Sequence, residues 1–436
     1  MVPSRACQYR FVTTSALDHA RQAFADRHPQ SRLLHETART VLPGGHTRTV
    51  LTHLPFPLTF VRGEGAVLTD ADDQQYIDLL GDYTAGLLGH SERRARDAAM
   101  AALDVNMSVG GIHPAEQQLA RLMCERFDLE LVRFTNSGSE ANLMAMTAAR
   151  MYTGRTKIMV MYGGYHGGLM YFGAGPAAWN VPFPIVVGRF NDLDGCKALI
   201  AEHGSDLAAV LVEPLLGSAG CVPAVPAFLR GLADAARAVG AVAIMDEVMS
   251  SRLGPKGLSV QCGVESDLKT YGKYIAGGFS FGAFGGTADV MGIFDSTHAA
   301  HVPHAGTFNN NITSMAAGTE VLTNVYTAEV ATAFTERGDE LRENIAQVLA
   351  RYPLALCVSG SGTMMAIHAR AQRPTDGESA ADKNPALQEM LFLGLLRRGI
   401  YIAPRGMINL SLPVTDDQLA AFIDALADLC QELAAS

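Results

Sequence analysis

The sequence predicts an α/β protein, with a mostly parallel sheet in a large domain and a smaller α+β domain beside it. Short apolar segments repeatedly end in polar or glycine-rich corners and are separated by helical segments, which is typical of a sheet covered on both faces. From about residue 325 the order changes to a long helix followed by two adjacent strand-like stretches. The 436 residues, 48% of them hydrophobic, are enough to bury the core of both domains. We expect an N-terminal segment (1–75) that contributes to the small domain, a large domain (76–325) and a C-terminal small domain (326–436).

Composition and charge exclude several classes of protein. A net charge of −10 argues against nucleic acid or an anionic membrane as the main partner. No apolar run is long enough for a transmembrane helix. The seven cysteines are scattered and form no C-x-x-C pair, which fits a reducing cytoplasm. The histidines of HAAHVPH (298–304) have no neighbouring carboxylate or thiol, so they indicate a loop rather than a metal site.

The start of the chain carries no sign of a secretory signal. MVPSRACQYRFVTTSAL lacks an apolar core, but it has two arginines, several hydroxyl residues and no acid. An organelle transit peptide and a plain extension both stay open.

Residues 15–41 have the pattern of a helix, which Pro43-Gly44-Gly45 ends. The loop that follows contains an isolated arginine, Arg48. From its spacing alone, Arg48 is either a solvated loop charge or a substrate contact. Residues 55–80 then predict a β-meander with turns at Gly-Glu-Gly and Asp-Ala-Asp-Asp.

The next segments predict an anion site or an ordinary helix cap. Pro114 opens a helix through Phe127, and the strand Glu130–Phe134 leads into TNSGSE (135–140) and a helix to about Tyr152. Free N–H groups, two hydroxyls and the positive end of a helix dipole would face one point there. The same residues also suit a plain N-cap.

Two further strands end in residues that suit a ligand. Lys157–Met161 is followed by GGYHGG (163–168), whose glycines let the backbone approach a ligand and whose rings can stack on it. Ala208–Val212 ends in Glu213. Ligands of open α/β sheets bind at the carboxyl ends of the strands, so we expect the site there.

A carboxylate and a lysine complete this pattern. The apolar run Ala241–Met245 ends in Asp246, and the shorter run 267–271 ends in Gly272-Lys273. Pyridoxal phosphate needs one lysine to form a Schiff base with its aldehyde and one carboxylate to keep its pyridine nitrogen protonated. The sequence therefore predicts this cofactor.

The chain has six lysines, and only Lys273 stands at a strand end. Lys157 and Lys269 begin strands, at the opposite edge of the sheet. Lys273 lies between Tyr271 and Tyr274, where partial desolvation can lower its pKa. The other three lie in polar surroundings typical of the surface: Lys197, Lys256 and Lys383.

The rest of the chain adds two candidate ligands. FGAFGGTADVM (281–291) predicts a strand and a helix start without a dinucleotide or P-loop fingerprint. Thr307 in HAGTFNN suits a phosphate clamp, or equally a polar turn before a helix Ile312–Tyr326. Arg405 in APRG is either a second substrate contact or a surface turn. The C-terminal elements expected around it are a helix 328–350, strands Leu354–Val358 and Gly362–His368, a helix 387–398, a strand Ile408–Ser411 and a terminal helix from about Thr415.

With these residues identified, the chain resembles the class III aminotransferases, pyridoxal-phosphate enzymes of fold type I that include glutamate-1-semialdehyde aminomutases. The shared motifs are FTNSGSEANLMAM, GGYHGG, VLVEPLLG, AIMDEVM, TYGKYIAGG, FGAFGG and HAGTFNN. Within that family, the segments PFPLTFVRGEGA, GDYTAG, EVMSSRL, GTFNNN and APRG are similar to those of β-phenylalanine (β-amino acid) aminotransferases. The resemblance runs from about residue 29 to the end.

The resemblance implies a role for each candidate in holding pyridoxal 5'-phosphate. Lys273 would carry the cofactor and later move the proton, Asp246 would pair with the ring nitrogen, and Glu213 would support the site. Val248 and Tyr165 would pack on the two ring faces. The phosphate would be held by Ser137, Gly138 and Ser139, where the family more often has Thr in place of Ser139, and by Thr307 of the partner subunit, which implies a homodimer.

The resemblance also implies the substrates. Arg48 would bind the carboxylate of a β-amino acid donor, and Arg405 would help to bind an α-keto acid acceptor, 2-oxoglutarate or pyruvate. An aminomutase of the glutamate-1-semialdehyde type is the strongest alternative, although GTFNNN and APRG favour the transaminase. A racemase and a catalytically silent binding protein on the same fold are weaker alternatives.

Overall fold

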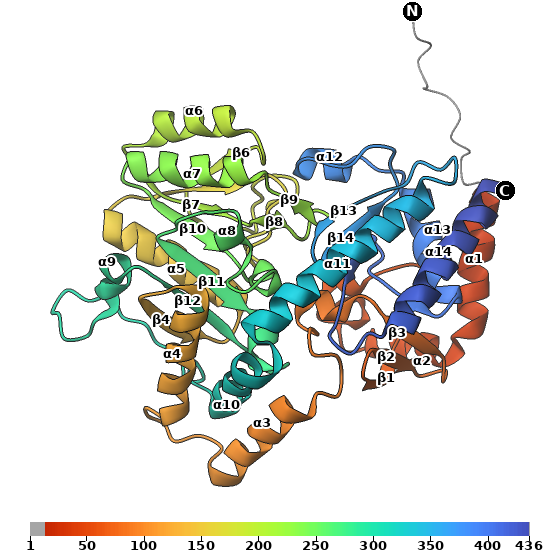
Figure 1. Cartoon of the computed structure of the whole chain (residues 1–436), viewed down its shortest axis with the longest axis horizontal. Helices are drawn as coiled ribbons and strands as arrows, with labels where there is room; N and C mark the ends of the chain where they lie inside the picture. The colour runs from red at the N-terminus through yellow and green to blue at the C-terminus, as the bar shows by residue number, and fades with distance from the viewer. Residues whose placement is uncertain (1–13, 436) are drawn as a thin grey trace, which may run out of the picture.

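A seven-stranded sheet forms the centre of the larger part of the molecule in the computed structural model, which describes residues 14–435 (Figure 1). In spatial order its strands are β4 (Leu131–Thr135), β12 (Gly282–Gly286), β11 (Leu268–Gly272), β10 (Val242–Asp246), β7 (Leu207–Val212), β5 (Lys157–Met161) and β6 (Ile185–Gly188). β12 is antiparallel to both of its neighbours, and the other neighbouring strands pair in parallel. The predicted α/β class with a mostly parallel sheet is confirmed.

Helices cover both faces of this sheet, and strand β5 shows how. Ile158 and Val160 pack in one hydrophobic cluster with α5 (Gly138–Thr153). Met159 and Met161 point to the opposite face, into a cluster with α6 (Leu193–His203) and α7 (Pro226–Ala238). Successive side chains of a strand alternate between faces, so a strand buried on both sides has to be apolar throughout. This explains the uninterrupted apolar runs of the sequence.

Further helices and short elements from residues 81–320 complete the large part of the molecule. The remaining helices of this part are α4 (Pro114–Phe127), α8 (Leu258–Gln261), α9 (Ala288–Met291) and α10 (Ile312–Glu320), with α3 (Arg93–Val105) packed on α10. Short elements at its edges are β8 (Leu215–Leu216), β9 (Val222–Pro223), η3 (Gly81–Thr84), η4 (Ser250–Arg252), η5 (Lys273–Ala276) and η6 (Gly292–Phe294).

The N-terminal and C-terminal parts of the chain pack together in one region of the molecule. The predicted meander is present as β1 (Phe60–Glu64), β2 (Val67–Asp70) and β3 (Gln75–Asp78), and β15 (Ile400–Tyr401) adds to β3 in parallel. In Figure 1, α1 (Thr14–Arg27) lies beside helices from the opposite end of the chain. The other elements of this region are β13 (Cys357–Ser361), β14 (Met364–His368), β16 (Met407–Asn409), α11 (Ala328–Leu349), α12 (Gly377–Ala381), α13 (Pro385–Arg397) and α14 (Asp416–Ala435). The division at residues 75/76 and 325/326 stays a prediction.

Several predicted elements differ from the observed ones, each for a local reason. The helix expected over 15–41 is two helices, α1 and α2 (Pro29–Ala38), because Pro29 has no N–H to continue the first. The helix expected to reach Tyr326 changes after Glu320 into a π-helical turn, Val321–Val325. The strand expected at Leu354–Val358 lies at Cys357–Ser361, since the turn at Gly362, whose φ is +51°, pairs Ser361 with Met364.

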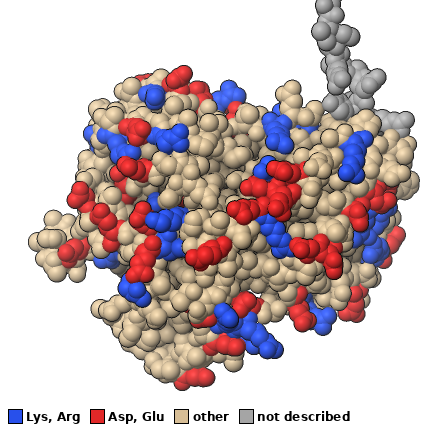
Figure 2. All heavy atoms as spheres, in the orientation of Figure 1, with Lys and Arg blue, Asp and Glu red and all other residues tan. Residues whose placement is uncertain are grey.

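The surface is mixed in charge. Figure 2 shows Lys and Arg interspersed with Asp and Glu over the visible face rather than gathered in one basic area. None of the helices formed by residues 14–435 combines the length and the apolar character that crossing a bilayer requires. Most of the N-terminal extension considered above lies outside the described residues.

Candidate active site

A cavity of about 880 Å³ opens at the carboxyl ends of the central strands. It brings together nine of the eleven predicted site residues, although they come from segments hundreds of residues apart: Arg48, Gly138, Ser139, Tyr165, Glu213, Asp246, Val248, Lys273 and Arg405. Ser137 and Thr307 do not line it. The placement follows from the parallel sheet, in which all carboxyl ends meet at one edge.

Asp246, the last residue of β10, is only 4% exposed and is held by three donors. Its Oδ2 accepts hydrogen bonds from Nδ1 of His166 (2.7 Å) and Nδ2 of Asn142 (2.8 Å). Its Oδ1 accepts from the N–H of Val248 (3.0 Å), and the hydroxyl of Thr270 fixes Asn142 by donating to its Oδ1 (2.7 Å). A buried carboxylate bonded in this way has one orientation, and it faces the cavity.

Lys273 follows β11 directly and has a φ of +57°, a left-handed conformation that is uncommon outside glycine. Burial lowers the pKa of Lys273 to about 8, against the opposing effect of the negative charges of Asp246, Glu213 and Asp82. A substantial fraction of the amine is therefore neutral, and nucleophilic, near physiological pH. Strain at this residue is typical of functional sites.

The N-terminus of α5 forms a narrow cradle. Ser137 caps the helix, its hydroxyl accepting from the N–H of Glu140 (3.2 Å). A Cβ at Gly138 would lie 2.6 Å from a methyl group of Val248, and one at Gly167 would lie 2.4 Å from the hydroxyl of Ser139. Glycines at these positions let the backbone N–H groups of the first helical turn reach the cavity. The cap and the anion site proposed as alternatives are both compatible with this geometry.

Thr307 is exposed and lies on a loop outside the cavity of its own chain. The loop is held beside the cradle by Asn309, whose side-chain oxygen accepts from Nδ2 of Asn136 (3.0 Å). No contact from Thr307 reaches the other site residues among the interactions of residues 14–435.

Tyr165 and Glu213 form the wall next to Asp246. The N–H of Tyr165 donates to Glu213 Oε1 (2.9 Å), and the N–H of Gly217 donates to Oε2 (3.0 Å). Burial, assisted by the neighbouring Asp246, raises the pKa of Glu213 to about 7. The ring of Tyr165 remains partly exposed to the cavity.

The two arginines lie over one aromatic ring. The guanidinium carbon of Arg48 is 5.4 Å from the ring centre of Tyr83, and that of Arg405 is 5.0 Å from it. Arg48 also donates to Asp82 Oδ1 at 2.8 Å. Arg405 has no carboxylate within 4.0 Å among the described residues, and its Nε is buried without a partner. An uncompensated guanidinium facing a cavity is suited to bind a carboxylate.

Sequence reasoning missed several residues of the cavity. Tyr171 and Trp179, the chain's single tryptophan, add to the aromatic wall beside Tyr165. Asn142 and His166 lie inside motifs that were recognised, but their bonds to Asp246 depend on the fold. Asp82 and Tyr83 belong to GDYTAG, where no spacing of residues indicated a contact with a ligand.

Lys383, which does not line the cavity, differs from its predicted place at the surface. It is half-buried, and this desolvation, together with the charge of Arg405, lowers its pKa.

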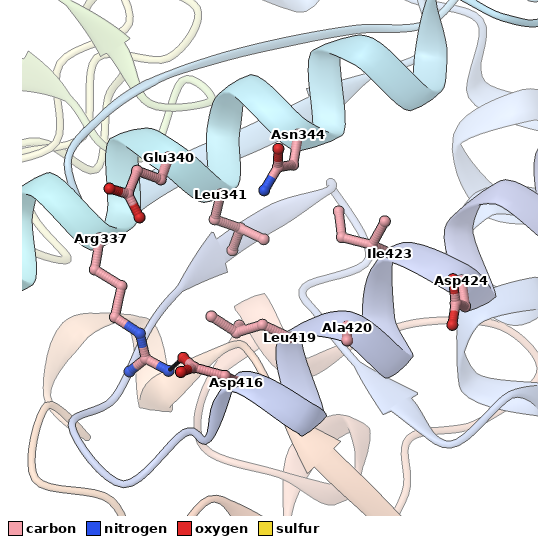
Figure 3. A pocket seen from close by; sticks show the side chains of 9 residues that line it. All are labelled: Arg337, Glu340, Leu341, Asn344, Asp416, Leu419, Ala420, Ile423 and Asp424. Atoms are coloured by element: carbon pink, nitrogen blue, oxygen red, sulfur yellow. Dashed lines mark hydrogen bonds and ion pairs between the residues drawn. The ribbon is translucent and has the colours of Figure 1, made fainter.

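A second hollow lies on the surface between α11 and α14, and it shares no residue with the first (Figure 3). Leu341, Leu419 and Ile423 form its apolar floor, and an ion pair between Arg337 and Asp416 (2.7 Å) closes one end. It contains no strand end and no lysine, so it offers none of the chemistry described above. Within residues 14–435, no group of three or more His, Cys, Asp and Glu side chains is placed to hold a metal ion.

Comparison with known proteins shows the family of this chain. The family model of class III aminotransferases matches residues 51–175 and 187–430. A β-phenylalanine transaminase from Variovorax paradoxus is 46% identical over 94% of this chain and 95% of that protein. A glutamate-1-semialdehyde 2,1-aminomutase from Desulforudis audaxviator is 34% identical over 93% of this chain and 97% of its own.

Solved structures show the same fold. The crystal structure of the β-phenylalanine aminotransferase from Variovorax paradoxus superposes with a TM-score of 0.95 at 45% identity, covering 97% of this chain and 98% of that one. A transaminase with pyridoxal phosphate bound has a TM-score of 0.86 at 31% identity, covering 94% of this chain and 98% of its own.

The residues of the cavity fit this cofactor, since Lys273 suits its aldehyde, Asp246 its ring nitrogen and the glycine-lined cradle its phosphate. From the family match, the shared fold and this fit, we conclude that the chain belongs to the class III aminotransferases and is an enzyme that uses pyridoxal 5'-phosphate.

Proposed function

We propose that this aminotransferase moves the amino group of a β-amino acid, of the β-phenylalanine type, to 2-oxoglutarate or pyruvate. The observation that carries the proposal is the pair of arginines, Arg48 and Arg405, over the ring of Tyr83 in the cavity that also holds Lys273. The similarity to a β-phenylalanine transaminase supports the same donor class.

Two carboxylate sites are needed for a chemical reason. A β-amino acid carries its amine one carbon farther from the carboxylate than an α-amino acid does. With the reacting lysine fixed, one carboxylate clamp cannot serve both the β-donor and an α-keto acid acceptor. We assign Arg48 to the carboxylate of the donor and Arg405 to the acceptor, each through its guanidinium fork.

The other site residues hold and orient the cofactor, which when bound withdraws electrons from the carbon that carries the amine. Asp246 would keep the ring nitrogen protonated, with its own orientation fixed by His166 and Asn142. Lys273 would hold the aldehyde carbon and, once released, move a proton at the amine-bearing carbon. Val248 and Tyr165 would enclose the ring, with Glu213 supporting Tyr165 through its backbone N–H. The cradle at Ser137, Gly138 and Ser139 would hold the phosphate.

An aromatic wall supports a donor with an aromatic or large apolar side chain. The rings of Tyr165 and Tyr171 are 5.7 Å apart, and those of Tyr171 and Trp179 are 6.5 Å apart. Trp179 is 51% exposed although it lines the cavity, so part of its apolar surface is uncovered.

We further propose a homodimer in which Thr307 of the partner subunit helps to hold the phosphate. Large apolar side chains between α3 and α4 are unusually exposed, Met107 at 82% and Ile112 at 81%, and Phe308 beside Thr307 is also exposed. A second copy of the chain would cover such side chains. A cytoplasmic location, which the scattered cysteines suggest, stays a prediction.

A donor panel tests the function. Purified holoenzyme is assayed with β-phenylalanine, β-homoleucine, 3-aminobutyrate and glutamate-1-semialdehyde, each with and without 2-oxoglutarate or pyruvate. We expect turnover of the β-amino acids that depends on the keto acid. Turnover of glutamate-1-semialdehyde without a keto acid would instead establish the aminomutase, which the similarity to such enzymes keeps as the second candidate. Turnover of no β-amino acid would overturn the donor assignment.

A further inference from the structure

The turn Gly81–Thr84 beside the two arginines has an unusual backbone. Four consecutive residues have positive φ, +53° at Gly81, +43° at Asp82, +54° at Tyr83 and +79° at Thr84. Three of them carry side chains, for which the left-handed region is unfavourable. Strain of this kind persists only where the surrounding structure enforces it, and it is concentrated at functional sites.

Surrounding hydrogen bonds hold this turn in place. Asp78 Oδ1 accepts from the N–H groups of Leu80 (2.8 Å) and Gly81 (3.1 Å). Asn409 donates through Nδ2 to the carbonyl of Leu80 (3.0 Å). The hydroxyl of Tyr83 donates to the carbonyl of Val50 (3.0 Å), which ties the turn to the loop that carries Arg48. The turn is therefore anchored by the end of β3, by β16 and by the segment that follows Arg48.

The strained turn delivers a carboxylate to the substrate side of the cavity. Asp82 lines the cavity, is 53% exposed, and accepts a single hydrogen bond from Nη1 of Arg48 at 2.8 Å. The other donors of that guanidinium group stay available to a ligand. Arg405, on the same tyrosine ring, has no acidic partner among the described residues. This part of the cavity therefore contains two cations and one anion.

The charge of Asp82 also reaches the reacting amine. Asp82 is one of the three carboxylates whose negative charge opposes the lowering of the pKa of Lys273. A carboxylate that acts on Lys273 and contacts Arg48 lies in the region that a substrate has to occupy.

We propose that Asp82 is a specificity-determining residue, whose negative charge favours ligands with one carboxylate over ligands with two. The inference rests on the proposed function, because it concerns how the two-arginine region selects substrates. Asp82 repels each carboxylate that enters, so a dianion loses about twice as much binding free energy as a monoanion. A β-amino acid with an uncharged side chain therefore loses less binding free energy to this repulsion than a dicarboxylic acid does.

The substitution Asp82→Asn tests the charge alone. Asparagine retains an oxygen that can accept from Arg48, and it tolerates the left-handed conformation well. Dissociation constants of glutarate and butyrate, which the enzyme does not transaminate, are measured by calorimetry on the holoenzyme at constant ionic strength. For D82N we expect the dissociation constant to fall about tenfold for glutarate and about threefold for butyrate.

The matched control is Asp97→Asn, which neutralises an exposed aspartate of α3 that also lies next to an arginine, Arg96. It should change neither constant. Unchanged constants in D82N, or an equal change for both ligands, would overturn the proposal, and weaker binding of both would show that Asp82 merely positions Arg48. In the steady state, D82N should lower KM for 2-oxoglutarate more than KM for pyruvate.

The binding test is independent of the proposed donor class. Because the binding of glutarate and butyrate does not depend on turnover of a β-amino acid, a failure of that donor class would be seen only in the donor panel.

Discussion

The two ends of the cavity are built in opposite ways. At the end of the cavity that we assign to the cofactor, Asp246 and Glu213 are almost fully buried, lie at the carboxyl ends of strands of the central sheet and accept at least two hydrogen bonds each. At the substrate end, Arg48 and Asp82 lie on connecting segments, are about half exposed and share a single hydrogen bond.

Under the proposed function, this difference would separate chemistry from selectivity. Buried groups with satisfied hydrogen bonds hold one geometry, which a reaction that tolerates little misplacement requires. Charges on half-exposed loops are screened by solvent, and each contributes little to the stability of the protein. They can therefore be replaced without loss of the fold. Substitutions at the first end should abolish the reaction, and those at the second should redirect it.

The largest expected effect is at Lys273. Lys273→Ala removes the nucleophilic amine, and we expect kcat to fall by about 10⁴-fold for every donor. Borohydride should also no longer attach the cofactor covalently to the chain, which mass spectrometry detects, because an aldehyde that is not linked to a lysine is reduced without a bond to the protein. Wild-type behaviour of this variant in both measurements would contradict the assigned chemistry.

Asp246→Asn should have the second largest effect. The amide keeps the shape of the side chain but not its charge, so the ring nitrogen would no longer be held protonated. We expect kcat to fall about 10³-fold in single-turnover measurements, for all donors alike. Asp97→Asn serves as the control on the surface and should leave kcat unchanged. A loss confined to one donor would mean that Asp246 acts on the substrate instead.

The arginines provide the matched pair at the other end. Arg405→Met should raise KM for 2-oxoglutarate about 30-fold and change KM for the β-amino acid much less, because a charge-assisted bidentate contact to the acceptor is lost. Arg48→Met should raise KM for the β-amino acid and change KM for 2-oxoglutarate much less. Each variant is the control for the other, measured at saturating co-substrate. Equal effects of both variants on both KM values would refute the division of roles.

The smallest expected effect is a pH dependence at the cofactor end. With the pKa of Lys273 at about 8, the amine is mostly protonated below that pH and mostly neutral above it. The rate at which apoenzyme combines with pyridoxal phosphate should therefore rise about tenfold between pH 7 and pH 9. Stopped-flow absorbance follows this reaction. A rise of about 100-fold over the same range would show that the negative charges of the cavity, rather than burial, control the pKa of the amine, and a flat rate would place that pKa below 7.

Much of the cofactor end could be predicted from the sequence. An uninterrupted apolar run marks a strand covered on both faces, and the residue after it lies at the edge where parallel strands present ligands. That reasoning predicted Asp246, Glu213 and Lys273 at this edge from their positions, and in the structure all three line the cavity. It was less accurate at boundaries such as β13, where the turn at Gly362 sets the register of the hairpin.

The substrate end could not be predicted in the same way. Arg48 and Arg405 were indistinguishable from surface charges until the resemblance to a family was considered. Their common feature, the ring of Tyr83, is 35 residues from the first and 322 from the second along the chain. No local pattern marks Asp82 either, because its left-handed turn is imposed by partners such as Asn409.

By itself, then, the amino-acid sequence determined which strands are buried and which polar residues end them, since hydrophobic periodicity and turn residues are local properties. Only the tertiary structure decided which charges meet across the cavity and which of them remain unpaired. The reason is that electrostatic contacts depend on distance in space, which the order of residues along the chain does not specify.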